Sequence, residues 1–268
     1  MTKGNHHHGQ KQYKRKRNRR GKRRSSHSDR YLVLQGKGSG GKTVVAGWLA
    51  EFLISRGQPV HCIDGDPVNR SLAQYKALPV EKIDLVNQSG VVVRSRYDAL
   101  VDRFINEDAV FVVDSGATAF LPFWTYVVES DIPTVLREAG PRVYVYVPVS
   151  CGEMLNDTLL GFRTLAETAA EKSLVVWINE YFGPVARDGK TFDQVQVYVD
   201  NREKVLASVG IPERPPDTFG ENIRRMRERK LTFEEAIRTT TAFYLVEKSR
   251  LFRVQHELFE QLERTPFA

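Results

Sequence analysis

Residues 31–43 read YLVLQGKGSGGKT, an apolar run followed by a glycine-rich loop and the beginning of an amphipathic stretch. The loop from Gly36 to Thr43 matches the pattern GxxxxGK[ST] and joins a predicted strand to a predicted helix, the context in which this pattern binds phosphate. Glycines let successive backbone N–H groups converge on phosphate oxygens, and the helix N-terminus adds the positive end of its dipole. These residues therefore predict a P-loop that binds a nucleoside triphosphate.

The side chains of the loop have separate expected roles. Lys42 is expected to reach the terminal phosphates, and the hydroxyl of Thr43 to complete the ligand shell of a hydrated Mg²⁺ ion. The residues expected to contact the nucleotide here are Gly36, Lys37, Gly38, Ser39, Gly40, Gly41, Lys42 and Thr43. The alternative is a glycine-rich turn without a ligand, which the full match in this context disfavours.

Short apolar runs alternate with amphipathic stretches along the rest of the chain. Nearly all-apolar runs are typical of strands covered on both faces, so we expect an α/β fold of the P-loop NTPase type, a mainly parallel sheet with helices on both faces in three αβα layers. The expected strands cover 31–34, 60–64, 110–114, 142–147, 174–179 and 208–211. Helices are expected after Gly41, Ser71 and Tyr97, and over 152–172, 193–207, 220–229, 232–239 and 241–264.

The charge of the chain is divided unevenly. Residues 1–30 carry twelve Lys and Arg against one acid, Asp29, whereas residues 31–268 carry 28 basic and 32 acidic residues. We expect a disordered basic arm over 1–30 and a P-loop ATPase domain over 31–268 that includes the C-terminal helices. Such an arm can bind nucleic acid or an acidic protein by releasing counterions. Charge runs are unspecific, so a solubilising tail stays open as an alternative.

Targeting and membrane signals are missing from the sequence. The apolar run 31–34 is far too short for a secretion signal, and no stretch approaches the length that spans a bilayer. The last residues, HELFEQLERTPFA, carry more acid than base, which disfavours a basic amphipathic membrane helix. We expect a cytoplasmic protein without membrane insertion.

Acidic residues follow two of the expected strands. Strand 60–64 leads into IDGDPVN, with Asp64 and Asp66, and strand 110–114 ends in Asp114 followed by SGA. An open parallel sheet binds its ligands beyond the carboxyl ends of the strands. Asp114 is therefore expected to hold Mg²⁺ through water, as in a Walker B strand, with Gly116 giving the next loop freedom to move. The alternatives are that Asp64 caps its strand and that Asp66 shapes a turn before Pro67.

Lys37 narrows the class of P-loop protein. It follows the first glycine, and KGSGGKT resembles the deviant Walker A motif KGGxGK[ST] of the ParA and MinD ATPases. The resemblance implies ATP as the nucleotide, a catalytic Lys37 that reaches across a dimer interface, and an Asp66 that orients the attacking water. It also implies that Asn179 reads the adenine edge and that Pro212 lies beside the base. The alternative for Lys37 is a solvated loop charge.

Other stretches are more specific than P-loop motifs in general. They are LQGKGSGGKT (34–43), GQPVHCIDGDPVNRSLAQYKAL (57–78), DSGA (114–117), VVWINEYFGP (175–184) and LTFEEA (231–236). Through them, the chain from Leu32 to about Leu262 resembles the TraL family of plasmid conjugal-transfer proteins. Ser39 and Ser115 depart from the expected glycine and asparagine. The resemblance implies an accessory ATPase of conjugative DNA transfer, a nucleotide-switched homodimer that works with the conjugation machinery.

Two other functions remain open on the sequence. A ParA-like DNA-partitioning ATPase would hold DNA through the basic arm. A small-molecule kinase or synthetase would need arginines over the transferred phosphate, and the late cluster Arg224, Arg225, Arg227 and Arg229 is a candidate. The simpler interpretation of this cluster is a solvated helix face.

Overall fold

The core of the protein is a seven-stranded parallel sheet, seen in a computed structural model that describes residues 29–85, 87, 91 and 93–266. Its strand order is β3-β2-β4-β1-β5-β6-β9, and each neighbouring pair is parallel. The strands are β1 (Arg30–Val33), β2 (Val60–Asp64), β3 (Val80–Lys82), β4 (Val110–Asp114), β5 (Val143–Ser150), β6 (Leu174–Asn179) and β9 (Val205–Ile211). Strands β7 (Ala186–Arg187) and β8 (Lys190–Thr191) form a separate antiparallel ribbon.

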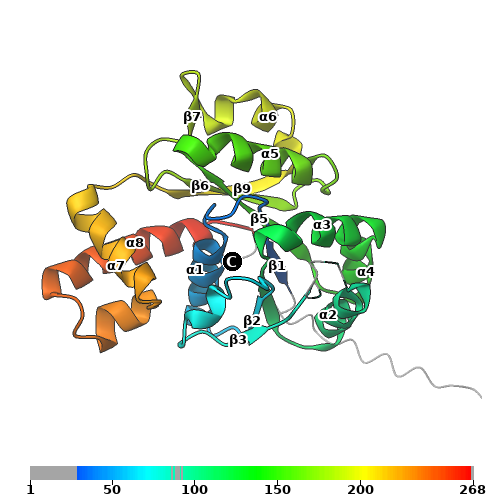
Figure 1. Cartoon of the computed structure of the whole chain (residues 1–268), viewed down its shortest axis with the longest axis horizontal. Helices are drawn as coiled ribbons and strands as arrows, with labels where there is room; N and C mark the ends of the chain where they lie inside the picture. Colours follow the sequence, from blue (N-terminus) through cyan, green and yellow to red (C-terminus); the bar gives the residue numbers. More distant parts are fainter. Residues whose placement is uncertain (1–28, 86, 88–90, 92, 267–268) are drawn as a thin grey trace, which may run out of the picture.

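Helices cover both faces of the sheet, which confirms the predicted three-layer arrangement (Figure 1). The α-helices are α1 (Lys42–Ser55), α2 (Arg94–Asn106), α3 (Phe120–Glu129), α4 (Ile132–Ala139), α5 (Leu155–Ala166), α6 (Gln196–Val199), α7 (Glu221–Glu228) and α8 (Leu245–Glu263). One core cluster joins the sheet to α1, α7 and α8, and the other joins it to α2, α3, α4 and α5. Two π-helical segments, Pro216–Gly220 and Glu235–Thr239, flank α7 in sequence.

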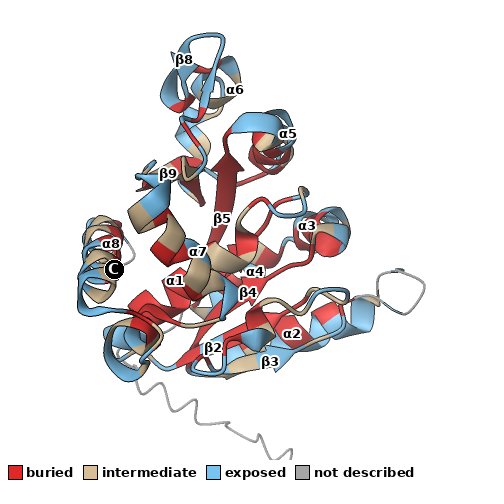
Figure 2. Cartoon of the chain, turned by 60° about the vertical axis from the view of Figure 1, so that its left-hand side comes forward, coloured by how far each residue is buried: buried red, intermediate tan, exposed pale blue. Residues whose placement is uncertain are grey.

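The central strands are buried on both faces. All five residues of β4 are buried, with Val110 and Val112 in the α1 side of the core and Phe111 and Val113 in the opposite side. Strand β5 shows the same burial in Figure 2. This two-sided burial explains why the strands read as continuous apolar runs in the sequence. None of the helices among the described residues combines the length and apolar character that a bilayer crossing requires.

Three helix predictions were wrong or too long. The segment after Ser71 forms only the short turn Leu72–Gln74, because the chain reaches Pro79 and then pairs β3 with β2. The predicted helix over 193–207 is broken into short turns, and its last residues belong to β9, which pairs with β6. Helix α5 ends at Ala166 rather than residue 172. Helices α3 and α4 and strand β3 were not predicted.

The sheet begins at Arg30, one residue before the predicted domain boundary, and the residue before it, Asp29, is also buried. Asp29 and Arg30 are buried, and the guanidinium of Arg142 donates to both carboxylate oxygens of Asp29 at 3.1 and 3.0 Å. The Arg30 guanidinium donates to backbone carbonyls, at 3.0 Å to Phe104, 3.1 Å to Glu107 and 2.5 Å to Ala109. The last two residues of the expected arm are therefore part of the folded domain. Residues 1–28 lie outside the described part.

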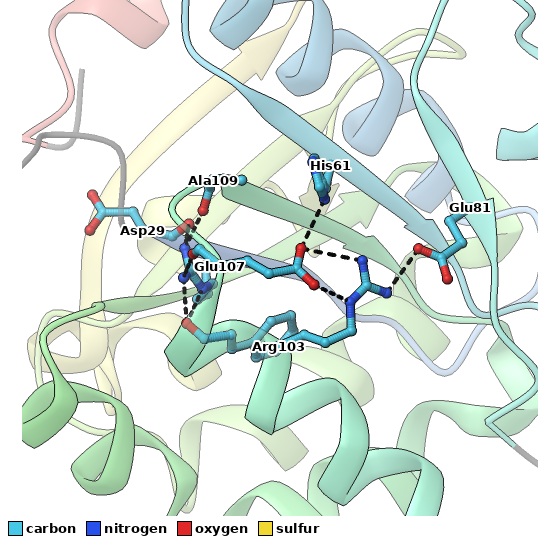
Figure 3. A network of polar contacts seen from close by, with 8 residues as sticks. Asp29, His61, Glu81, Arg103, Glu107 and Ala109 are labelled. Atoms are coloured by element: carbon cyan, nitrogen blue, oxygen red, sulfur yellow. Dashed lines mark hydrogen bonds and ion pairs between the residues drawn. The ribbon is translucent and has the colours of Figure 1, made fainter.

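An ion-pair network links side chains near the amino ends of β2 and β4 (Figure 3). Arg103 at the end of α2 bonds Glu107 at 2.6 Å and Glu81 at 2.8 Å. His61 Nδ1 lies 3.2 Å from a Glu107 oxygen. The hydrogen bond from Arg103 holds the pKa of Glu107 below its ordinary value. These contacts fix the edge of the sheet that lies opposite the P-loop.

Candidate nucleotide-binding site

The P-loop connects β1 to α1, as the sequence predicts. Its turn needs two left-handed residues, Ser39 with φ 62° and Gly41 with φ 92°. Glycine is at ease in this region, whereas a serine there is strained by its Cβ. Ser39 stands where the deviant Walker A motif has glycine. Ser39 therefore adopts the left-handed backbone conformation that favours glycine, although the residue at this position is a serine.

Two buried polar side chains, Gln35 and Ser150, form hydrogen bonds with the backbone of the P-loop. The Gln35 amide donates to the carbonyls of Pro148 at 2.8 Å and Thr158 at 3.1 Å, and its oxygen accepts from Gly36 N at 2.9 Å. Ser150 Oγ donates to Gly40 O at 3.3 Å. Sequence reasoning gave neither residue a role, because Gln35 lies just outside the pattern GxxxxGK[ST] and Ser150 is more than 100 residues away from the loop in the chain.

Lys42 and Thr43 lie at the N-terminus of α1. Lys42 Nζ donates to the carbonyl of Lys37 at 2.9 Å, so the lysine lies back across the loop. Burial lowers the pKa of Lys42, while Asp114 and Asp66 act in the opposite direction. Thr43 Oγ1 donates to Asp114 Oδ2 at 2.7 Å. The structure thus brings together the predicted phosphate lysine and the two predicted Mg²⁺ ligands.

Asp114 and Asp64 end adjacent strands in matching register. Burial raises the pKa of Asp114 to about 7, although the hydrogen bond from Thr43 opposes this shift. Burial also raises the pKa of Asp64. Asp64 accepts hydrogen bonds from the backbone N–H groups of Asp66 at 3.1 Å and Ala73 at 2.9 Å. Asp64 therefore holds the loop after its strand, as the capping alternative proposed.

Asp66 both shapes a turn and faces the site. Its Oδ1 accepts from the N–H groups of Val68 at 2.9 Å and Asn69 at 3.2 Å, which is the turn alternative considered on the sequence. A Cβ built on Gly116 would lie 2.9 Å from Asp66 Cα, so the loops after β2 and β4 are in close contact. Glycine at position 116 is what allows this approach.

A cavity of about 610 Å³ lies over the loop. It is lined by Gly38, Ser39, Gly40, Gly41, Lys42, Thr43, Val44, Asp66, Val68, Asn69, Ser71, Tyr75, Asp114, Ala117, Thr118, Arg224, Arg227, Glu228 and Lys230. Most of the predicted phosphate and Mg²⁺ residues therefore share one space. Gly36, Lys37, Asn179 and Pro212 do not line it.

Lys37 forms an ion pair outside the cavity. Its Nζ lies 2.6 Å from Asp157 Oδ2, and the two side chains are 40% and 51% exposed. The alternative of a solvated loop charge describes this conformation of the side chain. Its exposure also leaves Lys37 accessible to another molecule.

Asn179 and Pro212 lie at the same edge of the sheet, outside the cavity. Asn179 Nδ2 donates to Ser150 Oγ at 3.4 Å, and Asn179 Oδ1 accepts from Tyr181 N at 3.2 Å. A Cβ built on Gly41 would lie 3.3 Å from Asn179 Nδ2, so Asn179 is beside the start of α1. Pro212 is exposed directly after β9, whose last residue pairs in register with Asn179.

The cavity has a basic wall that sequence reasoning treated as a solvated helix face. Arg224 and Arg227 of α7 and Lys230 just after it line the cavity together with the P-loop. Their spacing of three residues places them on one side of a helix, which was the available signal. No pattern in the sequence indicates that this side faces a loop about 180 residues earlier in the chain.

The sheet order and the loop define the class of fold, the three-layer α/β fold of P-loop NTPases, and a comparison with solved structures agrees with this fold. The ParA family ATPase from Chlorobium tepidum TLS is 11% identical, with a TM-score of 0.50 over 87% of this chain and 99% of that one. Two proteins named TraL from Escherichia coli are 36% and 35% identical over 87% of this chain and 96% of theirs. No family model matches the sequence. The chain belongs to the TraL family, which confirms the resemblance noted above.

Proposed function

We propose that the protein binds ATP with Mg²⁺, hydrolyses it slowly, and acts as a nucleotide-switched dimer in conjugative DNA transfer. The observation that carries the proposal is the convergence of Lys42, Thr43 and Asp114 on one cavity beside the loop glycines. The donor set fits the ligand, because hydroxyl and carboxylate oxygens suit Mg²⁺ and a lysine suits phosphate. The role in conjugation rests on TraL family membership. A cytoplasmic location stays the expectation stated from the sequence.

The residues would act as follows. Lys42 would exchange the carbonyl of Lys37 for phosphate oxygens, and Thr43 and Asp114 would hold a hydrated Mg²⁺ ion. The ion supplies neutralisation of the charge on the phosphates. Asp66 orients the attacking water, and its contact with Gly116 couples its position to the loop after β4. Asn179 and Pro212 are proposed to contact the adenine.

Substitution of Lys42 tests nucleotide binding. Lys42→Ala is expected to weaken ATP affinity by roughly a hundredfold, because a buried charge-assisted contact with phosphate is lost. Lys190→Ala, an exposed lysine on β8, is the matched control and should bind as the unchanged protein does. The measurement is equilibrium binding of ATP with Mg²⁺ by calorimetry. Unchanged affinity in a folded Lys42→Ala protein would remove the basis of the proposal.

Substitution of Lys37 tests the dimer. The protein is expected to dimerise with ATP and to separate after hydrolysis, with Lys37 reaching the nucleotide of the second subunit. Lys37→Ala should keep ATP affinity in the monomer and lose both ATP-dependent dimerisation and hydrolysis. Analytical ultracentrifugation with and without nucleotide measures the first, and phosphate release the second. A Lys37→Ala protein that dimerises and hydrolyses normally contradicts the switch mechanism.

One observation favours a second candidate, a small-molecule kinase or synthetase. Arg224 and Arg227 line the cavity over the loop, which is where such an enzyme needs cations. A switch ATPase transfers phosphate only to water, so released phosphate should equal the ADP formed. ADP formed in excess of free phosphate, in the presence of a candidate acceptor, would favour the transferase.

A further inference from the structure

Helix α7 lines one side of the cavity and lies on the same face of the sheet as α1, next to α8 (Figure 1). Its buried residues Ile223 and Met226 belong to the same core cluster as the apolar face of α1. This packing fixes the position of α7 relative to the P-loop. The side chains that α7 presents to the cavity are therefore held in place by the fold itself.

The arginines near this wall differ in their partners. Arg224 bonds Glu221 at 2.7 Å and Glu228 at 2.6 Å, and Arg225 bonds Glu247 at 2.5 Å. Arg227 lines the cavity, is half-buried as a residue, and makes no hydrogen bond or ion pair with any residue that the structure describes. A guanidinium beside a cavity and without a carboxylate partner is free to donate hydrogen bonds to an anion that enters the cavity.

A second cation, Lys230, lies on the same wall of the cavity as Arg227. Lys230 lines the same cavity with its Nζ 5.9 Å from the centre of the Tyr75 ring. Burial lowers the pKa of Lys230, and the charge of Arg227 adds to this effect. The acid of this wall, Glu228, is already bonded by Arg224. The α7 wall thus presents net positive charge to the space above Lys42 and Thr43.

We infer that Arg227 binds the terminal phosphate of the nucleotide held by the P-loop of its own subunit, an inference that rests on the proposed function. Guanidinium groups bind phosphate through two parallel hydrogen bonds, and one cavity contains both Arg227 and Lys42. The nucleotide then bridges α1 and α7. Because ADP lacks the terminal phosphate, Arg227 is a residue that distinguishes ATP from ADP.

The ratio of ATP to ADP affinity tests this role. Arg227→Ala is expected to weaken ATP binding by roughly ten to a hundredfold and ADP binding little, because only the contact with the terminal phosphate is lost. Arg227→Lys should restore part of the difference. Arg229→Ala is the matched control, an exposed arginine of the same segment that does not line the cavity. Calorimetric titration with each nucleotide and Mg²⁺ gives the affinities, and thermal unfolding without nucleotide shows that each variant is folded.

Two outcomes separate this inference from the proposed function. If the unchanged protein binds neither ATP nor ADP, the proposed function and the role of Arg227 are both overturned. If it binds them and a folded Arg227→Ala protein keeps the original ratio of ATP to ADP affinity, only the role of Arg227 is overturned. Mixing Arg227→Ala with Lys42→Ala subunits tests the same-subunit assignment. Restored ATP affinity would place Arg227 on the partner's nucleotide and overturn it, whereas no restoration supports it.

Discussion

Glu51 is a carboxylic acid within the buried part of α1. Its Oε2 accepts a hydrogen bond from Phe233 N at 2.7 Å, and Glu234 and Glu235 lie close enough to repel its charge. Burial raises the pKa of Glu51 to about 8. The folded protein therefore holds this carboxyl protonated at pH values where the unfolded chain has released the proton.

The pH dependence of stability follows from this shift. Between the ordinary Glu pKa of 4.5 and about 8, the unfolded chain binds fewer protons at Glu51, so the free energy of unfolding falls as the pH rises. Glu51→Gln removes this titration. From pH 5 to pH 8 the variant is expected to gain stability relative to the unchanged protein, on the order of a few kcal/mol at most. Urea unfolding across this range measures it.

An exposed acid is the control for this experiment. Glu171→Gln should follow the unchanged protein at every pH. A constant difference between Glu51→Gln and the unchanged protein from pH 5 to pH 8 would show that Glu51 titrates as an ordinary acid in the folded state.

Gly116 sets the distance between two loops of the site. A Cβ at this position would lie 2.9 Å from Asp66 Cα, which is backbone and cannot rotate away. Gly116→Ala should displace Asp66 and lower the rate of ATP hydrolysis by about tenfold or more, because misplacement of a positioning group is costly. Steady-state phosphate release measures the rate. A normal rate of hydrolysis in the variant would show that the position of Asp66 does not determine this rate.

At the residue scale, the sequence predicts the parts of the site that are close in the chain. Residues 38–43 carry their signal in one motif, and Asp66 and Asp114 follow apolar strands whose carboxyl ends meet at one edge. Gln35 and Ser150 carry no local signal, because their function is to bond backbone groups that only the tertiary fold brings near. The spacing of Arg224, Arg227 and Lys230 indicates a shared helix side, but only the tertiary fold shows that this side lines a cavity with the distant P-loop.

At the element scale, the strands were predicted more reliably than the helices. Six strands that pair in the sheet read as apolar runs, whereas β3 is three residues long and mostly exposed. Residues 193–207 show helical spacing, yet Val205–Ile211 pairs with β6 because burying an apolar edge outweighs local helical preference. Helix α4 was not predicted, although its Pro133 lies in the first turn, where proline is tolerated.

Gly47 is a glycine in the middle of α1. A Cβ there would lie 3.9 Å from the side chains of Leu72 and Leu78, which is ordinary contact distance. Gly47→Ala is expected to raise the free energy of unfolding by about 0.5–1 kcal/mol, because alanine is the better helix former and space exists for its methyl group. Urea unfolding measures the change. Destabilisation would mean that α1 packs more tightly against Leu72 and Leu78 than these distances indicate.

At the scale of the whole molecule, the fold does not test the predicted function of the basic segment before Asp29. The structure describes no residue before Asp29, so the expectation that this segment binds nucleic acid remains a prediction. The full chain should bind DNA with an affinity that falls steeply as the salt concentration rises, because bound lysines and arginines release counterions. A chain that starts at Asp29 keeps the anchor of β1 and should lose this binding.

Filter binding or fluorescence anisotropy at several salt concentrations makes the comparison. Equal DNA affinity in the full and shortened chains would assign the binding to the domain. Salt-independent binding would argue against simple contacts with phosphate. The same pair of proteins, sized with ATP, shows whether the segment affects dimerisation.

The direction of β1 has a practical consequence. The strand starts at the Arg30 anchor and ends at the P-loop, and the five residue steps from Arg30 to Gln35 span roughly 16 Å of extended chain. A dye, affinity support or surface linker joined ahead of Asp29 would attach at the far edge of the sheet from the pocket. Immobilised molecules would keep the pocket open to the flowing buffer, so binding and release of nucleotide can be followed on a sensor surface.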